Sequence, residues 1–206
     1  MAIKPILFNT EMVRAILDGR KTCTRRIVKD GIPDDAMWGY TAFTPKGYIS
    51  CRGVYADGYG EEFYKLPYQP GDLLYVRETF IQIAAHTFWY KADGKSWMLK
   101  DFRWKPSIHM PKKAARIWLK VTNVRVERLQ DITEDEAKAE GANWKNGKNV
   151  GIEEKMNRTA IERFAEIWDG TISKTNLYRY GWKANPWVYV IKFERCEKPE
   201  GWTNER

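Results

Sequence analysis

The sequence is poor in residues that bind metals or form disulfides. Three cysteines, Cys23, Cys51 and Cys196, are widely spaced and form no C-x-x-C pair. Two histidines, His86 and His109, lie in neither an H-x-E nor an H-E-x-x-H context. Such a set supports no disulfide framework, zinc ribbon, zinc hydrolase or zinc deaminase. We therefore expect a protein without metal or cofactor in a reducing compartment.

Long apolar runs and several common motifs are also absent. No stretch approaches the roughly 20 apolar residues of a membrane span, and the apolar run at the N-terminus is too short for a signal peptide. There is no Walker loop, G-x-S-x-G elbow or dinucleotide fingerprint. The sequence thus predicts a soluble cytoplasmic protein that does not bind membranes.

The composition is that of one basic globular domain. The 206 residues are 43% hydrophobic, and 35 Lys and Arg outnumber 27 Asp and Glu, which gives a net charge of +8. This length and apolar content suffice for a hydrophobic core, so we expect a single domain over residues 1–206. The charge favours an anionic partner such as RNA or a nucleotide, and general solubility is the alternative explanation.

Apolar periodicity and turn residues predict a mixed α+β chain. Strands are expected over 5–8, 22–28, 73–78, 115–130 and 187–193, and helices from about 10 to 18, 134 to 140 and 157 to 168. One hairpin is expected from 47–54 and 61–66, and another around the turn Asp93–Gly94.

One carboxylate has an unusual predicted position. Thr133 and Glu136 form a capping-box pattern that opens a short helix, and this helix ends at Glu140 and Gly141. The partial negative charge at a helix C-terminus disfavours a carboxylate there by a few tenths of a kcal/mol. Either a nearby cation or exposure to water would relieve this, and we expect exposure.

Hydroxyl and cationic side chains are concentrated in residues 19–26 (GRKTCTRR), directly after the first predicted helix. On a regular strand Thr24 and Arg26 face one side and Arg25 faces the other. Lys21 can therefore lie beside Thr24 only if it comes from the turn at Gly19. A helix cap followed by a solvated basic strand is the plain structural interpretation.

The same residues resemble the hallmark of the ASCH domain, G-x-K-x-x-E-x-R. Gly19, Lys21 and Arg26 match, and Thr24 stands where the hallmark has Glu. With Thr at this position, the segment is similar to the motif G-R-K-T-x-T-x-R of one subgroup, the 4-acetylcytidine amidohydrolases. The resemblance covers under half of the chain, in the segments 3–28, 70–79, 116–141 and 184–195, and the remainder resembles longer members associated with phages or prophages.

The resemblance implies a fold. ASCH domains have a β-barrel like that of the PUA module, the RNA-binding domain of pseudouridine synthases and archaeosine transglycosylases. We accordingly expect a single ASCH, PUA-like domain with a mixed β-barrel, short flanking helices and long loop insertions at about 29–69, 80–115 and 142–183.

The resemblance also implies an active site that needs no metal. By it, Thr24, Lys21 and Glu140 form the catalytic group of an amidohydrolase that converts 4-acetylcytidine, or a related 4-acylated cytosine nucleoside, to cytidine and a carboxylate. Thr24 is the nucleophile, Lys21 its activator and Glu140 the acid/base or orienting partner. Arg26 is expected to stabilise the developing oxyanion.

Further candidates for substrate binding are Arg20, Arg77 and Glu78. RNA is a second expected partner. The alternative function, from a different class, is a non-catalytic RNA- or nucleotide-binding ASCH module. Relatives in the family that are ribonucleases lie between the two classes, because they bind RNA and also catalyse a reaction.

Overall fold

The computed structural model describes residues 1–28, 31–94, 103–142 and 158–200. They divide into two compact units: unit 1 comprises 1–22, 71–122 and 193–206, and unit 2 comprises 23–70 and 123–192. Two strands, β9 (Trp118–Arg128) and β10 (Trp187–Cys196), each run through the division. Each unit contains a hydrophobic cluster of its own.

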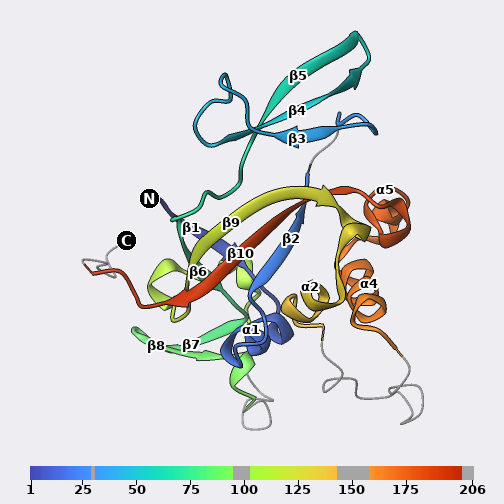
Figure 1. The fold of residues 1–206 in the computed structure, drawn as a ribbon. Helices are drawn as coiled ribbons and strands as arrows, with labels where there is room; N and C mark the ends of the chain where they lie inside the picture. The colour runs from blue at the N-terminus through green and yellow to red at the C-terminus, as the bar shows by residue number, and fades with distance from the viewer. Residues whose placement is uncertain (29–30, 95–102, 143–157, 201–206) are drawn as a thin grey trace. The chain divides into compact units, whose positions relative to one another are not determined.

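The sheet of unit 1 is built on β6 (Leu73–Arg77). β1 (Ile3–Leu7) pairs with it in parallel, with Ile3 opposite Leu73, and β9 pairs with it antiparallel, with Leu73 opposite Lys120. β1 and β6 lie side by side in Figure 1. The strands predicted over 5–8, 73–78 and 115–130 are thereby confirmed to within a few residues.

Helix α1 (Thr10–Leu17) of unit 1 agrees with the helix expected from about 10 to 18. The Asn9 side chain accepts a hydrogen bond from Met12 N, which satisfies one of the unpaired donors of the first turn. Gly19 follows with a φ of +73°, a left-handed conformation that glycine adopts without a steric cost. Residues 9–19 therefore contain both the start and the stop signal of this helix.

The second predicted hairpin lies earlier than expected. β7 (Phe80–Ala84) pairs antiparallel with β8 (Thr87–Tyr90), and Asp93 and Gly94 instead end a 3₁₀ helix, Lys91–Asp93. The prediction was wrong because a positive φ at glycine suits a helix end as well as a hairpin turn. Two more 3₁₀ helices of unit 1 are Ser107–His109 and Lys112–Ala114.

Unit 2 contains two groups of strands. β2 (Cys23–Ile27) pairs antiparallel with β10, and β3 (Met37–Gly39), β4 (Tyr48–Tyr55) and β5 (Gly58–Lys65) form an antiparallel sheet in that order. The hairpin predicted from 47–54 and 61–66 is confirmed. The expected insertion at 29–69 is therefore not a long loop, because alternating residues and short turns give it a sheet of its own.

The helices of unit 2 follow β9. α2 (Glu134–Ala139) packs against α4 (Ala160–Thr171), and α5 (Leu177–Tyr180) comes after them (Figure 1). The described part of unit 2 also has the 3₁₀ helices Leu129–Asp131, Lys174–Asn176 and Trp182–Ala184. Much of the loop expected from 142 onward, residues 143–157, lies outside the described residues. None of the described helices is long and apolar enough to span a bilayer.

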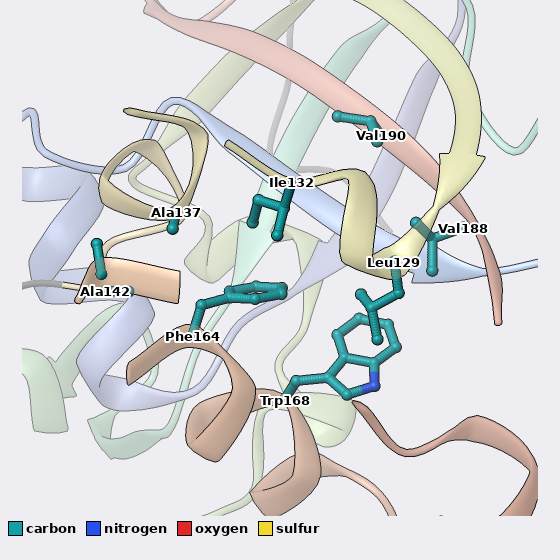
Figure 2. Packing of buried hydrophobic residues seen from close by; sticks show 9 residues of the cluster. Leu129, Ile132, Ala137, Ala142, Phe164, Trp168, Val188 and Val190 are labelled. Carbon is teal, nitrogen blue, oxygen red and sulfur yellow. The ribbon is translucent and has the colours of Figure 1, made fainter. Parts of the chain in front are cut away.

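The core of unit 2 lies between α4 and the ends of β9 and β10. Figure 2 shows Phe164 and Trp168 of α4 pointing toward Ile132 and Leu129, and all four side chains are buried. The indole Nε1 of Trp168 donates to Tyr180 O at 2.8 Å, so this large ring is buried without an unpaired donor. This core holds α2 and the end of β9 in place.

The mixed α+β class is confirmed. The strand pairings within unit 1 and within unit 2 make open sheets. A closed PUA-like barrel and a single domain over the whole chain stay predictions.

Replacing Phe164 with alanine tests the importance of this core. We expect Phe164→Ala to lower the free energy of unfolding by about 3–5 kcal/mol, because it removes a buried ring and leaves a cavity. The matched control is Phe43→Ala, since the Phe43 ring in the same unit is 81% exposed, and its cost should stay within about 0.5 kcal/mol. Urea unfolding measures both, and equal losses would contradict this assignment.

Candidate active site

Strand β2 carries the central residues of the candidate site. Its pairing with β10 places Arg26 opposite Tyr189 and Thr24 opposite Ile191. Directly paired residues share a face of the sheet, so these four side chains lie on one face and Arg25 lies on the other. The alternation predicted from sequence is thus confirmed, and Thr24 is buried to 1% exposure.

Thr24 and Arg26 are joined by a hydrogen bond. Arg26 Nη1 donates to Thr24 Oγ1 at 2.8 Å and to the backbone oxygen of Arg25 at 3.0 Å. Burial lowers the pKa of the Arg26 guanidinium, while the nearby Glu140 carboxylate and Tyr68 phenol act in the opposite direction. An arginine stays protonated in proteins, so Thr24 Oγ1 has a permanent cation beside it. That arrangement favours negative charge on or near this oxygen.

Glu140 is buried, which contradicts the expectation that it is exposed. It is the C-cap of α2, is 8% exposed, and its Oε1 lies 3.3 Å from Arg25 Nη1. Its charge also acts on Arg26. The guanidinium groups of Arg25 and Arg26 offset the unfavourable position of a carboxylate at a helix C-terminus. Nearby cations, and not the expected exposure to water, therefore relieve it.

Arg25 is the centre of a buried ion-pair network. Its side chain has 0% exposure, and Nη2 lies 2.6 Å from Glu127 Oε1 and 2.8 Å from Glu136 Oε2. Arg125 contacts the same two glutamates, at 2.7 and 2.6 Å. Burial alone would lower the pKa of Arg25, but Glu140 and Glu127 outweigh it and raise the pKa. These ion pairs join β2, β9 and α2 around the candidate site.

The capping box predicted at Thr133 is half correct. The Thr133 side chain accepts from Glu136 N at 3.3 Å, as expected of an N-cap. The Glu136 carboxylate does not return to Thr133 and bonds Arg25 and Arg125 instead. Charge-assisted bonds to two guanidiniums are stronger than one bond to a backbone amide, so the distant partners win.

Lys21 belongs to unit 1, and the division between the units falls between Thr22 and Cys23. The lysine follows the Gly19 turn, as required, because its backbone N donates to Ala15 O at 3.0 Å before β2 begins. Its side chain is buried, with Nζ 5.6 Å from the centre of the Phe8 ring. The catalytic role of Lys21 beside Thr24 stays a prediction.

The three further binding candidates all lie in unit 1 with partners of their own. Arg20 Nη2 pairs with Asp18 at 2.8 Å. Arg77 Nε donates to Met110 O at 2.9 Å, and its Nη2 donates to Ile108 O. These bonds have structural uses, and substrate binding by Arg20 and Arg77 stays a prediction.

Glu78, the third of these candidates, is a buried carboxylate with 1% exposure. Arg116 donates to both of its oxygens, from Nε at 2.9 Å and Nη2 at 3.1 Å. Burial raises the pKa of Glu78, and Arg116 counters part of that shift. Arg116 also lies over the Tyr90 ring at 3.9 Å, so the pair is held firmly within unit 1. A role for Glu78 in substrate binding stays a prediction.

Two tyrosines near Arg26 were missed by sequence reasoning. Burial raises the pKa of Tyr68, and the charge of Arg26 acts against this shift. Tyr189 pairs with Arg26 across the sheet, and its hydroxyl donates to Lys65 O at 3.3 Å. Strand alternation from a known pairing finds Tyr189, but no local signal marks Tyr68. Among the described residues, no group of three or more His, Cys, Asp or Glu could hold a metal ion.

Among known proteins, no protein-family model and no curated protein matches this chain. A similar solved structure is the high-resolution crystal structure of an ASCH domain from Lactobacillus crispatus JV V101, with 14% identity and a TM-score of 0.37 over 94% of this chain and 79% of that chain. Membership of the ASCH family, the amidohydrolase subgroup and the association with phages stay predictions based on the motif residues.

The Arg25 network makes stability depend on pH. Two arginines hold the pKa of Glu136 below its usual value, although burial alone would raise it. A carboxyl group with a lowered folded pKa stabilises the fold above its unfolded pKa of about 4.3, and this contribution is lost as pH falls through the folded pKa. We expect Glu136→Gln to lose about 2 kcal/mol at neutral pH and to approach the wild type in acid.

Urea unfolding from neutral to acidic pH measures this loss of unfolding free energy. Glu166→Gln is the control, because Glu166 is a half-exposed carboxylate of the same unit that is also paired with two arginines. Its loss should stay under about 1 kcal/mol. A constant difference between Glu136→Gln and the wild type at all pH values would contradict the assignment.

Proposed function

We propose that this protein is a metal-independent ASCH-type amidohydrolase that cleaves the acyl amide of 4-acetylcytidine or a related 4-acylated cytosine nucleoside. The supporting observation is the hydrogen bond from Arg26 Nη1 to the hydroxyl of buried Thr24, with Glu140 acting electrostatically on Arg26. A hydroxyl nucleophile, a cation beside it and a carboxylate nearby are the parts that acyl transfer needs in the absence of histidine.

The proposed reaction has two stages. Thr24 Oγ1 attacks the acyl carbon while its proton passes to Lys21, which takes this role by the family resemblance. Arg26 stabilises the oxyanion of the tetrahedral intermediate. The C–N bond then breaks as the proton that Lys21 took from Thr24 passes by way of the Glu140 carboxylate to the leaving 4-amino nitrogen of cytosine, which restores neutral Lys21 and ionised Glu140. Water hydrolyses the acyl-threonine ester, which restores the Thr24 hydroxyl and releases the carboxylate.

Arg25 limits what Glu140 does in this scheme. Its guanidinium lies on the opposite face of β2 from Thr24 and contacts Glu140 Oε1 at 3.3 Å. This anchor on Oε1 orients the carboxylate. The same contact favours the alternative function, a non-catalytic RNA- or nucleotide-binding module, because a buried ion pair needs no catalytic explanation.

Loss of the Thr24 hydroxyl should abolish turnover. With chelator present, we expect Thr24→Ala to reduce the rate of 4-acetylcytidine hydrolysis by roughly 10³-fold or more. The rate is measured from the loss of the acylated-cytosine absorbance. Thr22→Ala is the matched control, because Thr22 is an exposed threonine two residues away, and it should retain wild-type activity. Full activity in Thr24→Ala would show that Thr24 is not the nucleophile. If the wild type turns over no acylated cytosine, the result favours the alternative, a binding module.

Neutralising Glu140 should separate catalysis from folding. Glu140→Gln keeps the size of the side chain, and we expect hydrolysis to fall by about 10²–10⁴-fold, the usual contribution of a general acid or base. Glu136→Gln is the control, since Glu136 also bonds Arg25 but lies outside the proposed chemistry. Rates are compared under conditions where far-UV circular dichroism shows both variants folded. Equal rates in the two variants would assign Glu140 to the ion-pair network alone.

A further inference from the structure

Unit 2 has a pocket of about 280 Å³ at the end of β2 and the start of β10. None of the residues proposed for catalysis lines it. Its charged and aromatic lining residues are Asp34, Arg128, Arg179, Tyr180 and Trp187. A pocket that combines two guanidinium groups with two aromatic rings suits a ligand with both negative charge and a flat ring.

Arg128 is held in a fixed orientation in this pocket. Its guanidinium lies over the Trp187 ring at 4.3 Å, Nη1 donates to Asn185 O at 3.2 Å, and Nη2 donates to Asp34 O at 3.0 Å. The tryptophan covers one face of the group, and the side chain is still 24% exposed. Arg128 lines the pocket, so a flat ligand bound there can stack on its guanidinium plane.

The backbone beside Arg128 is built to aim a carbonyl at it. Asn185 is the one non-glycine residue with positive φ among the described residues, at φ 46° and ψ 53°. Its side-chain Oδ1 accepts from Gln130 N at 2.8 Å, which pins this conformation. Sparsely populated backbone conformations of this kind cost energy and cluster at ligand sites. The local strain and the oriented guanidinium thus point to one place.

We propose that this pocket binds a nucleotide, with the phosphate at Arg179 and the base stacked on the Arg128 plane. Guanidinium planes stack on bases, and arginine is a preferred partner of phosphate. The Asp34 side chain lines the pocket and is fully exposed, and although its Oδ1 lies 3.2 Å from Arg128 Nη2, the carboxylate can also accept from the exocyclic amine of a base. The volume lies just below the roughly 300–1,000 Å³ of most ligand pockets, which suits one base and excludes a large cofactor.

This site is separate from the proposed active site. Val28 lines the pocket and lies four residues beyond Thr24 on the same face of the strand, about 13 Å away at about 3.3 Å per residue. Nucleotide binding here therefore does not require the proposed hydrolysis. The shared chemistry, a base with a 5′-phosphate, occurs both in a free nucleotide and in an RNA strand.

Calorimetric titration of the full chain with adenosine 5′-monophosphate, adenosine and a short oligoadenylate tests the site. We expect saturable binding of the monophosphate, about tenfold tighter than adenosine because of a charge-assisted hydrogen bond to the phosphate. Arg179→Gln should remove this tenfold preference, and the side chain is exposed, so folding is preserved. Arg163→Gln, an arginine of α4 outside the pocket, should bind like the wild type.

The oligonucleotide distinguishes the two sources of the ligand. Oligoadenylate that binds more than tenfold tighter than the monophosphate assigns the pocket to an RNA strand, and equal affinities assign it to a free nucleotide. A wild-type protein that binds the monophosphate but hydrolyses no acylated cytosine rejects only the proposed function. The proposal is overturned by a lack of saturable binding of both phosphate ligands, or by binding that Arg179→Gln leaves unchanged.

Discussion

The candidate site of unit 2 depends on one buried cation, Arg25. Taking a guanidinium out of water costs several kcal/mol unless carboxylates surround it, and Arg25 meets Glu127, Glu136 and Glu140. These glutamates come from β9, α2 and the cap of α2, so the charge is fully compensated when all of these segments are in place. Breaking any one pair removes part of this compensation, which makes the network a constraint on the position of α2.

The same network positions a carboxylate of the candidate site. Alternation turns Arg25 toward one face of β2 and Thr24 and Arg26 toward the opposite face, so one short strand carries both the network and the candidate site. Glu140 contacts Arg25, and its charge also acts on Arg26. The position of a carboxylate proposed to act in catalysis thus depends on Arg25, a residue outside the proposed chemistry.

Much of the fold was predictable because its signals are local. Asn9 and Gly19 mark the limits of α1, Thr133 marks the start of α2, and the apolar residues of 187–193 mark β10. The failures have a common cause. Asp93 and Gly94 suit a hairpin or a helix end equally well, and the short strand β3, which was not predicted, is recognised only from its pairing with β4.

The sequence by itself determined the elements and the faces of the candidate site. Caps, glycine turns and strand alternation act over a few residues, so they place Thr24 and Arg26 together and Arg25 opposite without any knowledge of the fold. Only the tertiary structure decided the partners of Glu140 and the position of Arg128 over Trp187. The atoms of Arg25 and Glu140 that meet are 115 residues apart, and a contact of that span depends on how every intervening segment packs. Local rules therefore predicted which groups are present on β2, and the packing of α2 and β9 decided which charges they meet.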